Sequence, residues 1–287
     1  MDVASGTQRV KVSLAPTQST LLLTLYARVV DAQRPAPIIN DTRAVQVLNQ
    51  VEHDPADLRC HDTQQALILL RARQLDEWTA DFLESHSEAT VLHLACGLDS
   101  RCLRLNWGPK VRWIDVDFPD VVDLRAEVYE NPEGDYQLIS ADVTDDAWLK
   151  QIPTDRPTAV VFEGLTPYLE EATGKALIRR LAEHFKTGQL IFDTVGPLSV
   201  SLQSLIKPLK KAGAKFTWGT IVPLVGAIQG RDFASTAVAP GADALGVGRT
   251  SGVGDHIAAL LLRFPDQMTF EEAAGKWGIR LGLSGAA

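Results

Sequence analysis

Apolar and polar residues change their spacing along the chain near residue 90. Before that point, apolar residues recur three and four positions apart, which predicts amphipathic helices. These helices are expected at Thr17–Asp31, Asp41–Glu52 and Thr63–Leu83, and Asp62 is a candidate cap for the last of them. Residues 1–89 are therefore expected to form a helical cap that contributes to the active site.

From Thr90 onward, short apolar runs alternate with amphipathic segments. The predicted strands are Thr90–Leu94, Val111–Val116, Tyr136–Ala141, Thr158–Glu163, Gln189–Thr194 and Ile257–Phe264. The helices predicted between them are Phe118–Tyr129, Asp145–Lys150 and Glu170–Lys186. Strands that alternate with helices indicate an α/β fold whose mostly parallel sheet carries helices on both faces.

We expect residues 90–287 to form this α/β core, as one unit with the cap. Within it, residues 196–255 are expected to form a lid or substrate segment, because the stretch from 241 to 254 contains five glycines.

Composition limits the class of partner. The chain has 287 residues, of which 45% are hydrophobic and 22% charged, and its formal net charge is −8. Negative charge disfavours a nucleic-acid surface, and no apolar run approaches the roughly 18–20 residues that span a bilayer. Cys60, Cys96 and Cys102 have no second Cys or His pair at zinc-ligand spacing. We therefore expect a cytoplasmic protein without a metal, nucleic-acid or membrane partner, either a monomer or a homodimer.

The first predicted strand ends in a turn of small residues, LACGLDSR, at 94–101. Small residues between a strand and a helix let a ligand approach the backbone amides. The turn does not match G-x-G-x-x-G, because Ala95 replaces the first glycine, and it lacks a Walker lysine. An ordinary strand-to-helix turn is the alternative interpretation.

Acidic residues follow at the ends of the next two strands. Asp117 stands 20 residues after Gly97, the offset at which an acidic residue binds a ribose diol in nucleoside-binding α/β folds. Asp115 lies two positions earlier and would face the same side of the strand. The alternative for these carboxylates is to cap the helix that begins near Pro119. Asp142 follows the third strand, where a carboxylate can accept a hydrogen bond from an adenine amino group.

The fourth predicted strand ends in FEGLTPYL, at 162–169, which places Glu163, Gly164 and Tyr168 in one loop. Four consecutive strand ends with a suitable group are much less expected by chance than any one of them. The pattern predicts a ligand site at the carboxyl edge of the sheet.

Three segments, LHLACGLDSR, DVDFPDVVDLR and FEGLTPYL, resemble the leucine carboxyl methyltransferase family of class I S-adenosylmethionine-dependent enzymes with a Rossmann-like sheet. The segment TLLLTLYARVVDAQRPAPIINDTRAVQVL and the FTWG at 216–219 are similar to its branch of polyketide O-methyltransferases. The resemblance covers about residues 15–220.

The resemblance implies a site for S-adenosylmethionine, with S-adenosylhomocysteine as the product. Arg71, or Arg73 as the fallback, would hold the cofactor carboxylate, although an ordinary solvated helix charge is the alternative for Arg71. The residues that would contact the rest of the cofactor are Ala95, Gly97, Asp117, Phe118, Asp142, Val143, Glu163 and Gly164. The family more often has glycine at position 95.

The acceptor is expected in apolar space between the cap and the segment that follows the fifth strand. Arg28, Tyr168, Phe216 and Trp218 are its candidate lining, and a place in the core is an equal alternative for the last two. Such a lining would suit a planar, apolar acceptor.

A phenol or enol acceptor would need a general base, whereas a carboxylate would not. His256, His53 and Glu163 are the candidates for that base, and no histidine stands in a recognisable triad order. His93, inside the first strand, is expected to be packed in the core.

The sequence therefore predicts an O-methyltransferase that acts on a hydroxyl of a small planar secondary metabolite, such as a polyketide or alkaloid. The alternative is methylation of a protein C-terminal carboxylate. An NAD-dependent Rossmann oxidoreductase is a more remote alternative, because the glycine pattern is broken.

Overall fold

The computed structural model describes residues 9–11, 14–54, 58, 62–219, 234–238 and 257–264. His256 and the glycine-rich stretch 241–254 lie outside the described residues, as does most of the expected lid segment beyond Gly219.

The centre of the molecule is a seven-stranded sheet in the order β3-β2-β1-β4-β5-β7-β6. The first five strands are β1 (Thr90–Leu94), β2 (Arg112–Asp117), β3 (Asp135–Ser140), β4 (Thr158–Phe162) and β5 (Gly188–Val195). These five are parallel to their neighbours, while β7 (Ile257–Phe264) runs antiparallel to β5 and to β6 (Ala234–Val238). The mostly parallel α/β sheet predicted from the sequence is confirmed; β6 was not predicted.

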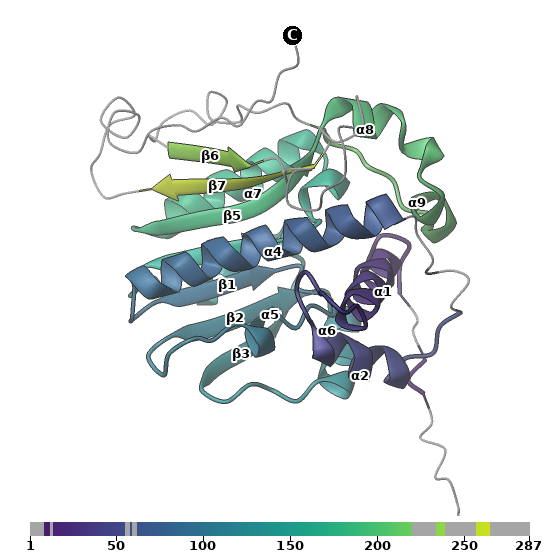
Figure 1. The fold of residues 1–287 in the computed structure, drawn as a ribbon. Coiled ribbons are helices and arrows are strands. Elements are labelled where there is room, and N and C mark those ends of the chain that lie inside the picture. The colour runs from purple at the N-terminus through teal and green to yellow at the C-terminus, as the bar shows by residue number, and fades with distance from the viewer. Residues whose placement is uncertain are drawn as a thin grey trace, which may run out of the picture.

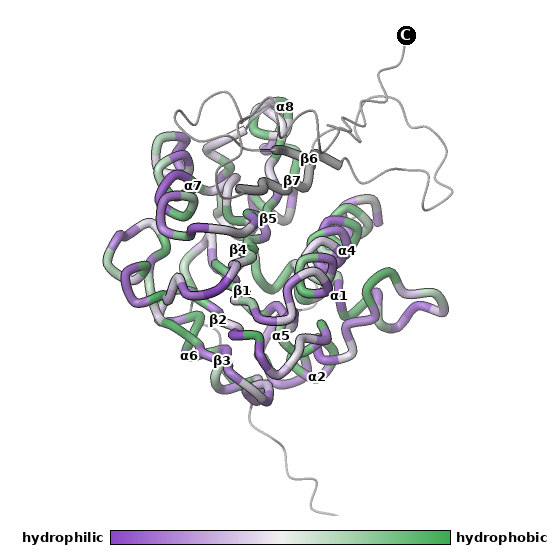
Figure 2. The backbone as a smooth tube through the Cα atoms, turned by 90° about the vertical axis from the view of Figure 1, so that its left-hand side faces the viewer, coloured by the Kyte–Doolittle hydropathy of each residue, from purple (hydrophilic) through white to green (hydrophobic). Residues whose placement is uncertain are grey.

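Helices cover both faces of the sheet, as Figure 2 shows with α7 on one side and α4 on the other. These are α4 (Asp62–Ser85), α6 (Pro119–Val128) and α7 (Glu171–His184). The helix α6 belongs to the α4 side, because its Arg125 contacts Asp115 and Cys102. Alternate strand residues point to opposite faces, so each face has its own apolar layer. Under α7, the buried layer includes Leu92, Ile114, Val160, Leu177 and Leu181. Under α4, it includes Leu75, Trp78, Val91, Trp113 and Val161.

The N-terminal helices sit at the carboxyl ends of β1, β2 and β3 (Figure 1). They are η1 (Gln18–Thr20), α1 (Leu21–Ala32) and α2 (Thr42–Gln50), and Asp41 caps α2 by accepting from the amide of Ala44 at 3.2 Å. The apolar face of this pair packs on Leu98 of the turn after β1 and on α6. The third predicted helix, α4, instead lies along the sheet, so it joins the cap to the core.

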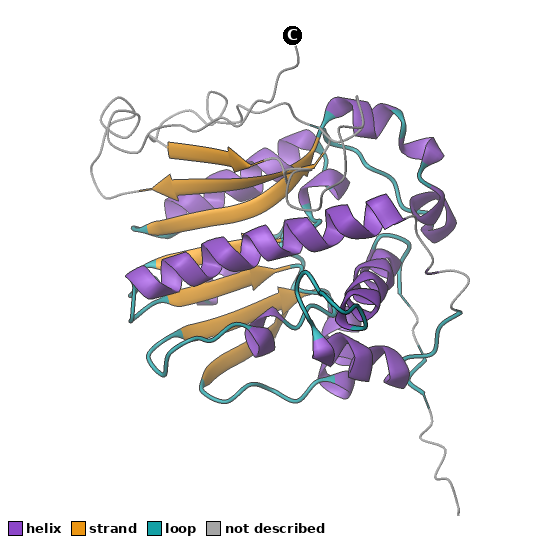
Figure 3. Cartoon of the chain, viewed as in Figure 1, coloured by secondary structure: helices purple, strands orange, loops and turns teal. Residues whose placement is uncertain are grey.

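Short helices fill the remaining connections (Figure 3). Their bounds are α5 (Arg101–Arg104), η2 (Trp148–Gln151), η3 (Thr166–Tyr168), α8 (Pro197–Ser201), η4 (Gln203–Leu205) and α9 (Lys207–Ala212). The helix predicted over 145–150 is therefore only a 3₁₀ turn. The side chain of Asp142 accepts from Thr144 just before it, and such local bonds compete with helix formation.

None of the helices in the described ranges combines the length and the apolar content that crossing a bilayer requires.

Candidate active site

The turn after β1 has a left-handed backbone at two positions. Ala95 and Gly97 both have φ = +50°. Glycine adopts this region freely, whereas an alanine there costs roughly 1–2 kcal/mol. A side chain at position 97 would also meet Leu21 of α1, with 3.5 Å between the two Cβ atoms. The cap therefore lies directly against the turn, and Ala95 is a strained substitute for glycine.

Asp117 joins the end of β2 to this turn. Its Oδ2 accepts from the amide of Gly97 at 2.7 Å and its Oδ1 from the amide of Phe118 at 2.8 Å. Burial raises the pKa of Asp117 above its usual range, while the two backbone donors oppose that rise. The N-cap of α6 is Phe118, so Asp117 does not take the capping role that was its alternative.

Asp115 faces a different environment, although it lies on the same strand. It accepts from Arg125 Nη2 at 2.7 Å, Trp113 Nε1 at 2.8 Å and Tyr136 Oη at 2.9 Å. Burial opposes its charge, yet Arg125 holds the pKa of this carboxyl well below its usual range. Asp115 is thus an internal counter-ion rather than a group free to hold a ligand.

Arg125 supports the turn from below, a role the sequence did not reveal. Its Nη1 donates to the carbonyl of Gly97 at 3.0 Å and to that of Asp99 at 2.7 Å. Because its Nη2 holds Asp115, one buried guanidinium fixes both β2 and the backbone of the turn.

Glu163 and Arg71 form an ion pair at the end of β4. Arg71 donates to Glu163 Oε1 from Nε at 3.1 Å and from Nη2 at 2.8 Å, and its Nη1 donates to Asp193 Oδ2 at 3.1 Å. Burial opposes the charges of both partners, but the attraction of Asp193 and Glu163 raises the pKa of Arg71, and the attraction of Arg71 and Arg101 lowers that of Glu163. Arg71 is therefore a buried, paired cation and not a solvated helix charge.

Gly164 follows Glu163 with φ = +67°, and its amide donates to Asp193 Oδ1 at 2.6 Å. A Cβ at this position would approach Arg71 Nη2 to 3.7 Å. The glycine keeps the space beside the guanidinium clear of side chains.

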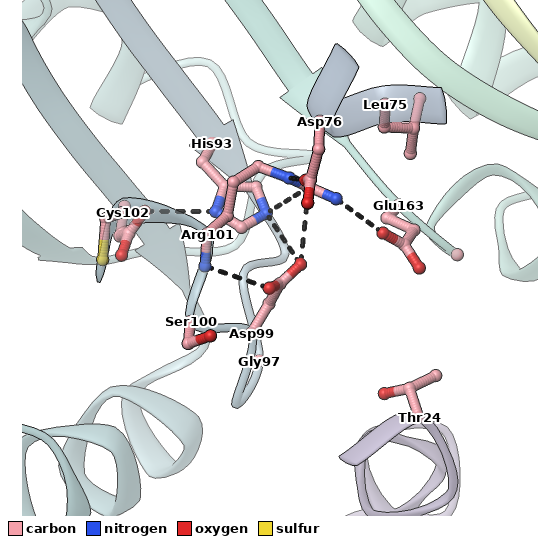
Figure 4. A network of polar contacts seen from close by, with 12 residues as sticks. Thr24, Leu75, Asp76, His93, Gly97, Asp99, Ser100, Arg101, Cys102 and Glu163 are labelled. Atoms are coloured by element: carbon pink, nitrogen blue, oxygen red, sulfur yellow. Dashed lines mark hydrogen bonds and ion pairs between the residues drawn. The ribbon is translucent and has the colours of Figure 1, made fainter. Parts of the chain in front are cut away.

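A second cluster of charges lies behind Glu163 (Figure 4). Arg101, at the start of α5, donates to Glu163 Oε2 at 2.7 Å and to Asp76 Oδ1 at 2.7 Å. His93 is buried as expected, with its Nε2 at 3.2 Å from Arg101 Nη1 and its Nδ1 at 3.2 Å from Asp115. Arg101 belongs to the quoted LDSR segment, but only the structure shows that its charge turns inward.

The other predicted residues are placed as follows. Asp142 and Val143 follow β3, where Asp142 Oδ1 accepts from the amide and hydroxyl of Thr144 at 2.8 and 2.7 Å. Phe118 is 36% exposed beside Asp117. His53 lies just beyond α2, with its Nδ1 at 2.9 Å from the carbonyl of Val51.

The expected acceptor residues divide into two groups. Arg28 is buried, and its guanidinium contacts the carbonyl of Leu98 at 3.2 Å and Asp99 Oδ1 at 3.2 Å, which favours a structural tie between α1 and the turn. Trp218 is buried in the cluster under α7, which favours the core alternative. Tyr168 and Phe216 are half-buried, and their rings form a tilted pair with 5.4 Å between centroids.

Comparison with known proteins identifies the family. The model of the leucine carboxyl methyltransferase family matches residues 22–182. The tetracenomycin polyketide synthesis O-methyltransferase TcmP of Streptomyces glaucescens is 43% identical over 208 residues, which are 72% of this chain and 77% of TcmP. The S-adenosyl-L-methionine-dependent methyltransferase dpfgK of Gibberella zeae is 41% identical, covering 72% of this chain and 76% of its own.

Solved structures confirm the fold. A Thermobifida fusca protein described as a methyltransferase superimposes with a TM-score of 0.57 at 14% identity, covering 83% of this chain and 94% of its own. A DUF574-family protein from Streptomyces avermitilis gives a TM-score of 0.56 at 12% identity, covering 86% and 97%.

The side chains at the strand ends fit S-adenosylmethionine. Arg71 offers a fork of donors suited to a carboxylate, and Glu163 offers an acceptor suited to an ammonium group. Asp117 keeps acceptor capacity beyond its two backbone bonds, as a ribose diol requires. The family model covers more than half of the chain, and its membership decides against the NAD-dependent alternative. The chain belongs to the leucine carboxyl methyltransferase family and is an S-adenosylmethionine-dependent methyltransferase.

Proposed function

We propose that the enzyme methylates a hydroxyl oxygen, a phenol or enol, of a small planar secondary metabolite such as a polyketide or alkaloid. The observation that carries this proposal is the 43% identity to TcmP, whose name assigns it O-methylation in tetracenomycin polyketide synthesis.

S-adenosylmethionine, when bound, supplies a methyl group on a positively charged sulfur. In this proposal, Arg71 and Glu163 hold its amino-acid end, Asp117 its ribose, and Phe118, Asp142 and Val143 its adenine. Ala95, Gly97 and Gly164 supply backbone without bulky side chains beside it. Orientation of the two reactants and exclusion of water can supply most of the acceleration of a simple displacement.

The cap is proposed to close this site. Leu21 of α1 lies against Gly97, and Arg28 of the same helix contacts the carbonyl of Leu98. These contacts place α1 over the turn that would receive the cofactor, so the helix shields the reaction from water.

Tyr168 and Phe216 are proposed to contact the acceptor. Their paired rings offer a flat, half-buried surface that suits an aromatic molecule. Burial raises the pKa of Tyr168, so its hydroxyl stays protonated at neutral pH and serves as a hydrogen-bond donor rather than a base.

A carboxylate acceptor, including a protein C-terminus, is the second candidate, and the matching family is named for leucine carboxyl methylation. Glu163 is held by Arg71 and Arg101, and Asp193 by Arg71, so neither carboxylate is free to take a proton from a phenol. A carboxylate acceptor needs no such base.

Methyl transfer to hydroxylated aromatic polyketides and to peptides that end in leucine separates the two candidates. We expect methylated aromatic products that keep the transferred methyl group in mild alkali. A methyl ether resists hydrolysis, whereas a methyl ester releases methanol. Transfer only to the peptide carboxylate would overturn the proposal.

A further inference from the structure

Glu163 has two arginine partners, one on each carboxylate oxygen. Arg71 of α4 binds Oε1 through Nε at 3.1 Å and Nη2 at 2.8 Å. Arg101 of α5 binds Oε2 through Nη2 at 2.7 Å. The two guanidinium groups therefore approach this carboxylate from different elements and do not compete for an oxygen.

The two arginines differ in how firmly they are held. The Arg101 side chain is fully buried, and besides Glu163 it contacts Asp76 at 2.7 Å, His93 at 3.2 Å and Asp99 at 3.4 Å. The Arg71 side chain keeps 10% exposure, and its ion-pair partners among the described residues are Glu163 and Asp193. Withdrawing Arg101 would strand several buried charges, whereas Arg71 can take an additional anionic partner at its exposed side.

We propose that Arg101 is a positioning residue for the amino-acid end of the cofactor, because it anchors Glu163 by Oε2 and leaves Oε1 to receive an ammonium group. Arg71 is then the exchangeable partner, which engages the cofactor carboxylate while Glu163 stays in place. The inference rests on the role proposed above for Glu163 and Arg71.

The electrostatics of Glu163 support this division. The charged groups that face it are Arg28 of α1, Arg71 of α4, Asp99 of the turn, Arg101 of α5 and Asp193 of β5. Burial opposes the charge of Glu163, and the attraction of Arg71 and Arg101 reverses that effect and lowers its pKa. When a second anion shares Arg71, Arg101 is the partner that keeps Glu163 ionised.

The test compares ligands with and without the amino-acid end, using Arg101→Met. S-adenosylhomocysteine has that end, and 5′-methylthioadenosine lacks it. Titration calorimetry at pH 7.5 is expected to show a loss of about 10- to 100-fold in affinity for S-adenosylhomocysteine, the scale of one charge-assisted contact. The affinity for 5′-methylthioadenosine is expected to change less than about threefold, since Gly97 and Asp117 are untouched.

Arg104→Met is the matched control. Arg104 shares Asp76 and Asp99 with Arg101 but has no contact with Glu163. Its loss also strands buried charges, and it is expected to leave the affinity ratio of the two ligands unchanged. A merely structural role for Arg101 predicts the same ratio in both variants.

A pH series gives a second readout that packing alone would not move. In the wild type, Glu163 stays ionised at neutral pH because its pKa is lowered. Without Arg101 its pKa rises, so Arg101→Met is expected to lose S-adenosylhomocysteine affinity as the pH falls from 8 to 6. The binding of 5′-methylthioadenosine is expected to stay flat over the same range.

Arg101→Lys and Glu163→Gln decide the case if Arg101→Met does not fold. In the otherwise wild-type protein, Arg101→Lys is expected to weaken the binding of S-adenosylhomocysteine but not that of 5′-methylthioadenosine. In a protein that already carries Glu163→Gln, adding Arg101→Lys is expected to weaken binding no further. Equal losses for both ligands, or an undiminished effect beside Glu163→Gln, would overturn the proposal. A wild type that binds both ligands equally well would instead refute the role given to Glu163 itself.

Discussion

Replacing Asp117 by alanine tests the strand-end site, because this carboxylate links the turn to the proposed ribose position. In the protein it accepts from Gly97 at 2.7 Å and from Phe118 at 2.8 Å, and it is 6% exposed. Two hydrogen bonds to a charged group contribute about 3–6 kcal/mol to folding. Burial of the carboxylate, seen in its raised pKa, offsets part of this, so we expect the free energy of unfolding to fall by about 1–3 kcal/mol.

The same substitution is also expected to weaken cofactor binding. Two ribose hydroxyls that lose a buried acceptor correspond to about 3 kcal/mol, or roughly 100-fold in the dissociation constant. Titration calorimetry with S-adenosylhomocysteine measures this directly. Asp123→Ala is the control, since it removes the same charge from an exposed position of α6. A change below roughly threefold for Asp117→Ala, in a folded protein, would refute the role given to this carboxylate.

Three further variants test the account in denaturant titrations. Ala95→Gly is expected to stabilise the protein by up to about 1 kcal/mol, because Ala95 has φ = +50°, and a clear loss of stability would contradict the strain. Asp115→Asn is expected to lower the free energy of unfolding by about 3–5 kcal/mol at pH 7, because it leaves the buried Arg125 without its carboxylate. The folded pKa of Asp115 is depressed, so this loss should shrink as the pH falls below about 4, and a pH-independent loss would argue against the ion pair. Gly174→Ala is expected to lower the free energy of unfolding by about 1–3 kcal/mol, since the added Cβ would overlap the ring of Trp218. Its control, Gly108→Ala, adds a Cβ in open space and should change stability by less than about 0.5 kcal/mol; equal effects would mean that Trp218 is not packed against Gly174.

The sheet could be predicted because local pattern carries its information. Apolar runs separated by amphipathic segments gave the five parallel strands, and β7 begins and ends where predicted, at Ile257 and Phe264. β6 (Ala234–Val238) was missed, because its run of small and polar residues lacks the strong apolar pattern that marked the other strands. The turn Ala95–Gly97 and its partner Asp117 follow from one spacing, and the structure joins them by a hydrogen bond.

The buried charges could not be predicted in the same way. Arg71 meets Asp193 across 122 positions of sequence, and Arg101 meets Asp76 across 25. Only the packing of α4 beside β5 and α5 brings these groups together, so a single sequence shows each as an ordinary charge. Likewise, the alternation of side chains along β2 predicted that Asp115 and Asp117 share a face of the strand. It did not predict that they are buried to different depths.

A crystal structure with S-adenosylhomocysteine bound tests the central claim most directly. The account predicts the carboxylate of the ligand on Arg71, its ammonium on Glu163 Oε1 and its ribose hydroxyls on Asp117, with Arg101 still bound to Glu163 Oε2. A ligand found away from the ends of β1, β2 and β4, or one that leaves these side chains without contact, would contradict it.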